Sequence, residues 1–147
     1  MDEICVRVTP SLWLWLAVSR KVRQVLGFAF GRRDRATLAL CWSDMPPDYQ
    51  DKPVVSDELA TYAGFFGSLG RAQQHRSCAK GSGETSIVES LNTKWRQRQS
   101  GLVRRACGTS RRIEADLVER FFLLVEQHNR HCRTRWEQRT TATRADQ

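Results

Sequence analysis

The sequence predicts an α/β domain in which helices flank a sheet and a basic helical extension follows. Three observations lead to this prediction. Segments rich in Val, Ile, Trp and Phe open the chain. The spacing of apolar residues then alternates between two residues, typical of strands, and 3.6 residues, typical of helices. The last third combines helical spacing with most of the net positive charge. At 147 residues, the chain is long enough for one domain with one hydrophobic core.

The first third predicts three strands, over Glu3–Val8, Leu12–Val18 and Val22–Phe30, because β-branched and aromatic residues dominate these segments. Turn-like residues separate them at Thr9-Pro10-Ser11 and at Ser19-Arg20. Strands this close in sequence are typical of an antiparallel meander.

The middle of the chain alternates between helix and strand. A first amphipathic helix is expected to stop at Pro46-Pro47, and a short buried strand over 53–57 leads to a second helix that begins near Glu58. Another short strand is expected near 73–78. The apolar positions at spacing i, i+3, i+4, i+7 that define the first helix are Leu38, Cys41, Trp42 and Met45.

The C-terminal part predicts helices. A Gly-rich loop at 80–83 leads to a helix from about Ser86, and a last helix is expected from about Ser110 to Cys132. Residues 140–147 have no apolar face, so we expect them to be disordered. The predicted organisation is therefore a core over 1–109, a helix packed on it within 110–139, and a disordered tail over 140–147.

The charge distribution indicates a polyanionic partner. The formal net charge is +8, and residues 94–147 carry 13 Lys and Arg against 6 Asp and Glu. Nucleic acid and an anionic membrane surface are the candidate partners. The longest apolar run, Leu12–Val18, is far shorter than the roughly 20 residues of a membrane-spanning helix.

The N-terminus and the cysteines indicate a reducing compartment. The start Met1-Asp2-Glu3 does not fit a secretory signal, so a cytoplasmic protein is expected. The five cysteines are scattered and never spaced as CxxC, which predicts reduced thiols rather than a disulfide framework or a zinc ribbon.

Three carboxylates are candidates for a metal site: Asp2 at the start of the first strand, Asp57 at the end of the crossover strand, and Glu89 in the first turn of a helix. Strand ends and helix starts meet at one edge of an α/β sheet, so all three can face one crevice. Carboxylate oxygens suit Mg²⁺, and two such ions support in-line phosphoryl transfer.

Each of these carboxylates also has a plain structural interpretation. Glu89 is favoured at a helix N-terminus by the macrodipole. Asp57 suits the cap of the helix that follows it. Asp2 suits a frayed terminus. Spacing alone does not decide between the two sets of interpretations, because the chain holds 16 acidic residues.

A set of short motifs, in this order and spacing, resembles the catalytic half of the transposases of insertion sequence one. The resemblance covers Asp2 to about Asn129. The motifs are Met1-Asp2-Glu3-Ile4, Trp13-Leu14-Trp15-Leu16-Ala17-Val18, Val25-Leu26-Gly27, Val54-Val55-Ser56-Asp57 with Tyr62, Lys80-Gly81-Ser82-Gly83-Glu84-Thr85, Ile87-Val88-Glu89-Ser90-Leu91-Asn92 and Arg96-Gln97-Arg98.

The resemblance implies a ribonuclease-H-like mixed sheet flanked by helices, with a DDE active site. The positions that match the family's catalytic and metal-binding residues are Asp2, Asp57 and Glu89, which would hold two Mg²⁺ or Mn²⁺ ions. It also implies double-stranded DNA as partner, both element ends and target, a homo-oligomer when active, and association with the nucleoid. The family's zinc-binding element and helix-turn-helix do not precede Met1, so an upstream fusion partner is expected to supply recognition of the DNA ends.

Further residues are candidate DNA contacts. Asn92 lies three residues after Glu89 on nearly the same helix face, where an amide can orient the carboxylate or touch a scissile strand, and Arg96 extends that face. Lys80 is placed to meet a phosphate, or it is a solvated loop lysine. The basic run, interpreted as phosphate tracking rather than a solvated face, comprises Arg98, Arg104, Arg105, Arg111 and Arg112.

Two remaining patterns favour structural roles. His128, His131 and Cys132 lack an evident fourth metal ligand and are interpreted as residues near a helix end, and the pair of His75 and Cys78 is weaker still. Trp13 and Trp15 alternate with leucines in a strand, which favours sheet packing over base stacking.

The sequence thus favours a DDE transposase catalytic domain that cleaves DNA strands and transfers them. Two alternatives stay open. A non-catalytic DNA-binding remnant or regulator would keep the basic helices without a working metal site, and a cellular ribonuclease-H-like nuclease would cut RNA in a hybrid without strand transfer.

Overall fold

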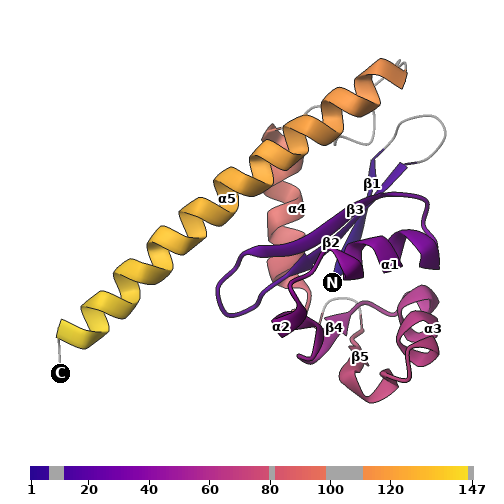
Figure 1. The fold of residues 1–147 in the computed structure, drawn as a ribbon, viewed down its shortest axis with the longest axis horizontal. Coiled ribbons are helices and arrows are strands. Elements are labelled where there is room, and N and C mark those ends of the chain that lie inside the picture. The colour runs from indigo at the N-terminus through magenta and orange to yellow at the C-terminus, as the bar shows by residue number, and fades with distance from the viewer. Residues whose placement is uncertain (7–11, 80–81, 99–110, 146–147) are drawn as a thin grey trace.

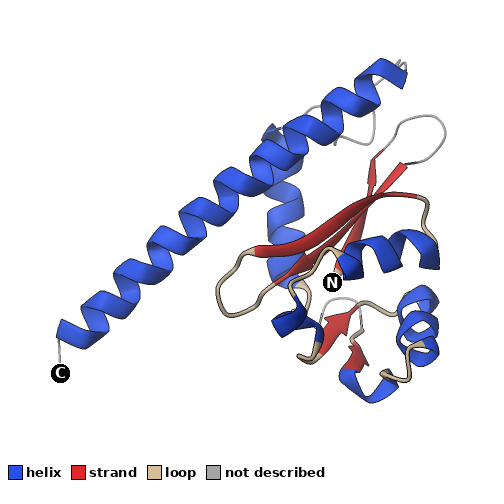
Figure 2. Ribbon diagram, in the orientation of Figure 1, coloured by secondary structure: helices blue, strands red, loops and turns tan. Residues whose placement is uncertain are grey.

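A small antiparallel sheet lies between two layers of other elements (Figures 1 and 2). The computed structural model describes residues 1–6, 12–79, 82–98 and 111–145, with side chains described except at 111–115 and 142–145. Helices α4 (Ser86–Arg98) and α5 (Arg111–Ala145) cover one face of the sheet. Helices α1 (Arg35–Ser43) and α3 (Ala60–Ser68) cover the other.

The sheet is the meander that the sequence predicts. Strands β1 (Asp2–Val6), β2 (Leu12–Val18) and β3 (Val25–Gly31) pair antiparallel in the order β1-β2-β3. The third strand begins at Val25 rather than Val22, so its predicted start is wrong. Arg23 has a φ of 62°, and this left-handed conformation belongs to the turn between β2 and β3 rather than to an extended strand.

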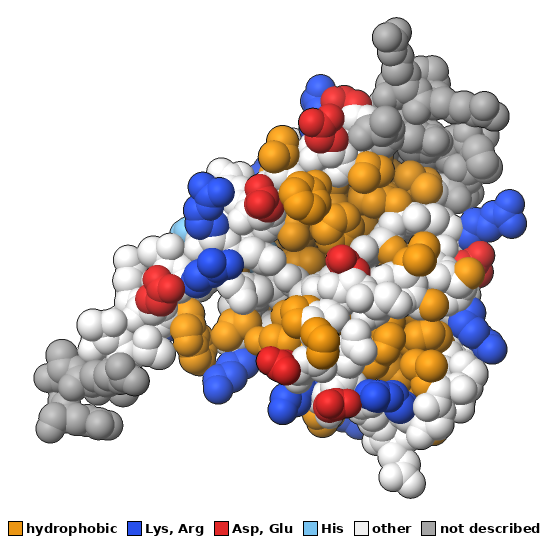
Figure 3. All heavy atoms as spheres, in the orientation of Figure 1, with side chains coloured by type: hydrophobic (Ala, Val, Ile, Leu, Met, Phe, Trp, Pro, Cys, Tyr) orange, Lys and Arg blue, Asp and Glu red, His pale blue; other side chains and the backbone are white. Residues whose placement is uncertain are grey.

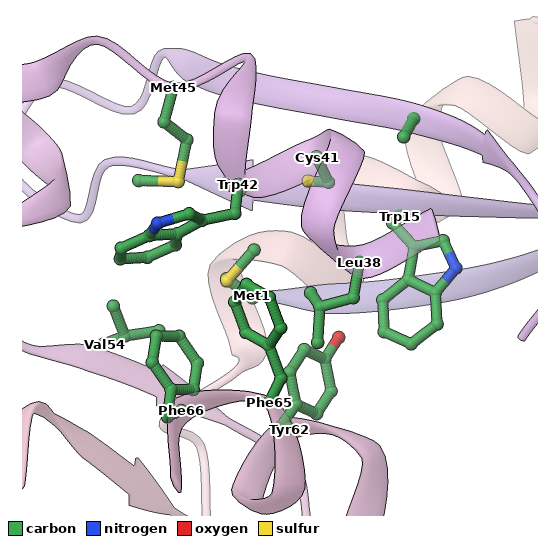
Figure 4. Close-up of a cluster of buried hydrophobic side chains, with 12 residues drawn as sticks. Met1, Trp15, Leu38, Cys41, Trp42, Met45, Val54, Tyr62, Phe65 and Phe66 are labelled. Carbon is green, nitrogen blue, oxygen red and sulfur yellow. The ribbon is translucent and has the colours of Figure 1, made fainter. Parts of the chain in front are cut away.

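Both faces of the sheet are apolar, because both are covered. Ile4, Leu14 and Leu16 pack against α4 and α5. Trp15, Ala17 and Ala29 belong to a second cluster with α1 and α3 (Figure 4). Trp15 is fully buried, which confirms its predicted place in the core, whereas Trp13 is half-buried and lies under the guanidinium of Arg33.

The crossover elements follow the predicted order. After α1 comes a single turn, α2 (Pro47–Gln50), and then β4 (Val54–Ser56) leads to α3. The short strand expected near 73–78 is divided into a 3₁₀ turn, η1 (Ala72–Gln74), and the strand β5 (His75–Ser77). Strands β4 and β5 pair parallel.

The α/β class is confirmed, with one difference in the sheet. The described strands form a three-stranded antiparallel sheet and a separate two-stranded parallel sheet rather than one mixed sheet. The amine of Met1 donates to the carbonyl of Val55, so the start of β1 lies beside β4 and brings the two sheets together.

Helix α5 is held to the edge strand β3 by polar contacts that the sequence did not reveal. The side-chain amide of Asn129 accepts from the N–H of Val25 and donates to its carbonyl, both at 2.8 Å. Gln24 Nε2 donates to the backbone carbonyl of Asn129 at 3.2 Å. Asn129 therefore takes the place of a neighbouring strand at this point of β3.

The C-terminal helix is longer than predicted. Helix α5 continues through Ala145, so the expectation that 140–147 is disordered is wrong for 140–145. The hydroxyls of Thr140 and Thr141 both donate to the carbonyl of Glu137 within the helix. In the described part of the chain, no helix combines the length and the apolar character needed to cross a membrane.

Gly27 is expected to tolerate no side chain, because α1 lies directly against β3 at this point. A Cβ on Gly27 would lie 2.6 Å from the carbonyl oxygen of Cys41 and 3.1 Å from the backbone N of Met45. Gly27→Ala should therefore lower the free energy of unfolding by about 1–3 kcal/mol in a denaturant titration. Gly67→Ala is the control, since a Cβ there meets nothing within 4 Å and the helix gains about 0.5–1 kcal/mol. Equal effects of the two variants would contradict this packing.

Candidate metal centre

Two strands bring Asp2 and Asp57 together. Asp2 opens β1, Asp57 directly follows β4, and the contact between Met1 and Val55 fixes these two ends side by side. One carboxylate oxygen from each of Asp2, Glu3 and Asp57 lies within 4.8 Å of the others. Asp2 is also paired with Leu16 in the sheet, so it does not lie in a frayed terminus.

Asp57 combines a structural role with its place in this cluster. Its Oδ1 accepts from the N–H of Leu59 at 3.1 Å, one residue before α3 begins. The interpretation of Asp57 as the helix cap is wrong, because the N-cap of α3 is Leu59 without a side-chain cap; the carboxylate instead stabilises the turn before α3. The same contact holds Asp57 at the carboxyl end of β4, facing Asp2.

The carboxylate of Asp2 accepts two hydrogen bonds in a partly buried position. Its Oδ1 accepts from the N–H of Glu3, and its Oδ2 accepts from Nδ2 of Asn92, both at 2.9 Å. The pKa of Asp2 is raised from 3.8 to about 6, mainly by burial and then by the charge of Glu3, while the hydrogen bond from the N–H of Glu3 opposes the shift. A cation beside Asp2 would offset this cost of ionisation.

Glu3 was not predicted as part of the cluster, and its charge is already balanced. Arg33 Nη2 lies 2.6 Å from its Oε1, and the hydroxyl of Tyr62 donates to its Oε2 at 2.9 Å. Burial, and then the charge of Glu3, raise the pKa of Tyr62, which keeps this hydroxyl protonated as a donor. The position of Glu3 next to Asp2 in the sequence was the only available signal. We assign Glu3 to holding β1 against α3.

Glu89 does not join the carboxylate cluster. It lies exposed in the first turn of α4, where its Oε1 accepts from the hydroxyl of Thr85 at 2.8 Å. This arrangement agrees with the interpretation of Glu89 as a helix-start residue. Helix α4 reaches the cluster through Asn92, one turn further along, whose Nδ2 donates to Asp2 and not to Glu89, the carboxylate that the spacing suggested.

The donor set around Asp2 suits a hard divalent cation. Asn92 is 5% exposed, and its Oδ1 has no hydrogen-bond partner although its Nδ2 is bound to Asp2. A buried carbonyl oxygen without a partner is costly. Two carboxylates and an amide oxygen are the ligands that Mg²⁺ and Mn²⁺ accept. The residues present therefore fit such an ion, with Asp2 and Asp57 as ligands.

The predicted DNA-contact residues are only partly described. Arg96 and Arg98 lie near the end of α4, and Nε of Arg96 is buried without a hydrogen-bond partner. Lys80, Arg104 and Arg105 lie outside the described residues, as do the side chains of Arg111 and Arg112. A groove of about 470 Å³ between α4 and α5 is lined by no carboxylate, and its basic side chains include Lys94, Arg98, Arg130 and His131.

The histidine and cysteine patterns form structural contacts. His128 Nε2 donates to the carbonyl of Arg23 at 2.8 Å, and Cys132 Sγ lies 3.5 Å from the same oxygen. His75 stacks on Phe66 with ring centroids 4.8 Å apart and bonds to the hydroxyl of Ser56. Within the described residues, the one grouping that fits a metal ion is the cluster of Asp2, Glu3 and Asp57.

Comparisons with known proteins leave the family open. The chain matches no model of a protein family, no curated protein and no solved structure.

Proposed function

We propose that this chain is the catalytic domain of a DDE-type DNA transposase with a ribonuclease-H-like arrangement, in which Asp2 and Asp57 hold divalent cations. The observation that supports this most is that Asp2 and Asp57 lie in one carboxylate cluster, in which the buried Asn92 is bound to Asp2. The proposed reaction comes from the resemblance of the motifs to the transposases of insertion sequence one. The excess of Lys and Arg after residue 93 supports double-stranded DNA as the partner.

In this proposal, Mg²⁺ or Mn²⁺ supplies Lewis-acid activation of water and of the phosphodiester. Water attacks phosphorus and the bond to the 3′ oxygen breaks, which leaves a 3′-hydroxyl on one strand end and a 5′-phosphate on the other. This 3′-hydroxyl attacks a target phosphodiester, is joined to the target's 5′-phosphate with loss of its proton, and displaces the target's 3′ oxygen as a hydroxyl. Asp2 and Asp57 position the ions, and Asn92 holds Asp2 in place. Glu89 is proposed as the third ligand, which requires a change of its side-chain conformation away from Thr85.

A non-catalytic DNA-binding protein is the second candidate. The observation that favours it is the position of Glu89, which lies outside the carboxylate cluster and is bound to Thr85. The basic groove between α4 and α5 would serve this function equally well, because binding to phosphates requires no metal ion. Metal binding by the purified chain separates the two candidates.

Calorimetric titration with Mn²⁺ is the first test. The wild-type chain is expected to bind Mn²⁺, and Asp57→Asn should weaken binding by more than about tenfold. Loss of a residue that only hydrogen-bonds a metal ligand already lowers metal affinity by about tenfold, and Asp57 is proposed as a ligand itself. Asn92→Leu should weaken it by about tenfold. The control is Asp48→Asn, an exposed carboxylate on α2, which should leave binding unchanged.

The outcomes decide between the candidates. Absence of Mn²⁺ binding by the folded wild-type chain would overturn the enzyme proposal and leave the DNA-binding candidate. If binding is observed, Glu89→Gln tests whether Glu89 is the third metal ligand. Labelled duplex DNA and a labelled RNA–DNA hybrid are then incubated with the chain and Mn²⁺ in parallel cleavage assays. Cleavage of the hybrid alone would favour a ribonuclease-H-like nuclease over a transposase.

A further inference from the structure

Ser56 is a buried residue that links Asp57 to a histidine outside the carboxylate cluster. It ends β4 directly before Asp57 and is 0% exposed. Its Oγ lies 2.8 Å from the backbone carbonyl oxygen of Asp57 and 2.8 Å from Nε2 of His75. His75 opens β5, which pairs parallel with β4, so the link follows from the pairing of the two strands. A continuous path of hydrogen bonds therefore runs from the imidazole of His75 to the backbone of Asp57.

The directions of these two hydrogen bonds follow from the available protons. A hydroxyl has one proton to donate, whereas a carbonyl oxygen can only accept. Ser56 therefore donates to the carbonyl of Asp57, and Nε2 of His75 carries a proton and donates to Oγ of Ser56. Hydrogen bonds in such a chain polarise and strengthen one another. Loss of the donor at His75 would thus weaken the bond that holds Asp57.

Helix α3 holds the imidazole of His75 in place. The ring stacks on Phe66, with centroids 4.8 Å apart and 9° between the ring planes, and on Tyr62, with centroids 6.2 Å apart and 26° between the planes. Figure 3 shows hydrophobic side chains gathered beside α3, and the buried cluster there includes both aromatic residues. The hydroxyl of Tyr62 also donates to Glu3 on β1. Helix α3 therefore acts on both sides of the cluster, on β1 through Glu3 and on the end of β4 through His75 and Ser56.

We propose that His75 is a positioning residue of the metal centre, which acts through Ser56 on Asp57. One hydrogen bond, from the N–H of Leu59, holds the carboxylate of Asp57, and the other, from Ser56, holds its backbone carbonyl. Together they fix the carboxylate so that it faces Asp2 before a cation binds. A preorganised ligand loses less freedom on binding, so the cation is bound more tightly. The inference rests on the proposed binding of a cation by Asp57, and His75 itself contacts no cation in it.

A nucleophilic serine activated by His75 does not fit this arrangement. A nucleophile must reach its substrate and give its proton to the base beside it. Ser56 is wholly buried, and its proton is directed to the carbonyl of Asp57. The remaining alternative is a contact that only packs β5 on α3 and has no effect on Asp57. This alternative depends on the ring of His75, whereas the positioning role depends on its donating nitrogen.

Calorimetric titration with Mn²⁺ tests the donor and the ring of His75 separately. His75→Phe keeps an aromatic ring for stacking and removes the donor, whereas His75→Gln keeps an N–H donor and removes the ring. His75→Phe and Ser56→Ala should each weaken Mn²⁺ binding by about tenfold, and the double variant by no more than either, because both act through one chain of hydrogen bonds. His75→Gln should stay within about threefold of the wild type, because it restores the donor. The control is Ser77→Ala, at an exposed serine of β5, which should leave binding unchanged.

Nitrogen NMR of the wild-type chain tests the hydrogen bonds without metal. Nε2 of His75 should carry a proton, and its signal is assigned by its loss in His75→Gln. An unprotonated Nε2 would overturn the proposal, because Ser56 would then donate to His75 and not to Asp57.

The affinities of the folded variants, checked by circular dichroism, decide the rest. Wild-type affinity in His75→Phe, a larger loss in His75→Gln than in His75→Phe, or additive losses in the double variant would each overturn the proposal, because His75 would then act through packing or independently of Ser56. A wild-type chain that binds no Mn²⁺ would overturn the proposed enzyme together with this inference. Mn²⁺ binding that is indifferent to His75 and Ser56 would overturn this inference alone, so the two failures are distinguishable.

Discussion

Asp2→Asn is expected to stabilise the metal-free protein at pH 7.5 while it abolishes Mn²⁺ binding. Asp2 has a pKa of about 6 in the folded chain against an ordinary value of 3.8, because burial and then the charge of Glu3 disfavour its ionised form. A raised folded pKa contributes stability that is complete below about pH 4 and is lost as the pH rises through 6. At pH 7.5 the ionised carboxylate therefore costs the folded state on the order of 1–3 kcal/mol.

Asparagine at this position removes the charge and supplies a donor. The side-chain oxygen of Asn can accept from the N–H of Glu3 as Asp2 does. Its amide nitrogen takes the place of Oδ2, so the amide of Asn92 turns over and accepts through Oδ1, and one hydrogen bond replaces another. The loss of the partly buried charge is therefore what favours the folded state. Urea titrations should therefore give Asp2→Asn about 1–3 kcal/mol more stability at pH 7.5 and a difference that vanishes near pH 4.

Adding Mn²⁺ reverses the order of the two proteins. The ion should stabilise the wild-type chain through binding to the folded state and leave Asp2→Asn unchanged. Asp48→Asn, at an exposed carboxylate, should match the wild type with and without Mn²⁺. If Asp2→Asn instead destabilises the chain at pH 7.5, Asp2 is a structural carboxylate, and its ionisation does not oppose folding.

The sheet and its neighbours could be predicted because their signals are local. Alternating β-branched and aromatic residues, broken by short turns, identify β1, β2 and β3 within a few residues. The start of β3 could not be placed, since Val22 suits a strand and nothing in the local pattern reveals the left-handed conformation of Arg23. That conformation depends on the turn, in which Arg23 donates to the carbonyl of Ser19.

The end of α5 was missed because apolar spacing was the criterion. Residues 140–145 have no apolar face, so their periodicity contains no helical signal. Extending an existing helix fixes one residue for each hydrogen bond gained, whereas starting a new helix is costly. Helix α5 therefore continues to Ala145, beyond Trp136, whose ring contacts the ammonium group of Lys21.

The meeting of Asp2 and Asp57 could be predicted from the strand topology, whereas the residue that α4 contributes depends on how that helix is rotated about its axis. Asp2 and Asp57 meet because strand ends converge at one edge. The burial of Val88, Leu91 and Trp95 against the sheet fixes the rotation of α4. At about 100° per residue, Asn92 then lies closer to the buried face than Glu89 does. Short-range spacing cannot show which of the two reaches Asp2, because both lie on nearly the same face.

Asn129→Leu is expected to lower the free energy of unfolding by about 2–4 kcal/mol, because two backbone groups of Val25 lose their partner together. Leucine matches the size of asparagine but neither donates nor accepts. It therefore leaves the N–H and the carbonyl of Val25 partly buried without hydrogen bonds. Urea titration measures the loss, and amide hydrogen exchange at Val25 should become faster by a corresponding factor.

Two comparisons separate this contact from the general packing of α5. Asn129→Asp keeps the acceptor for the N–H of Val25 and loses the donor to its carbonyl, so it should still destabilise the chain. Gln127→Leu, at an exposed neighbour, should change stability by less than about 0.5 kcal/mol. If Asn129→Leu costs no more than Gln127→Leu, water satisfies Val25 and α5 is held by its apolar contacts alone. A loss of the expected size would instead show that one amide closes the edge of β3 and fixes the docking of α5.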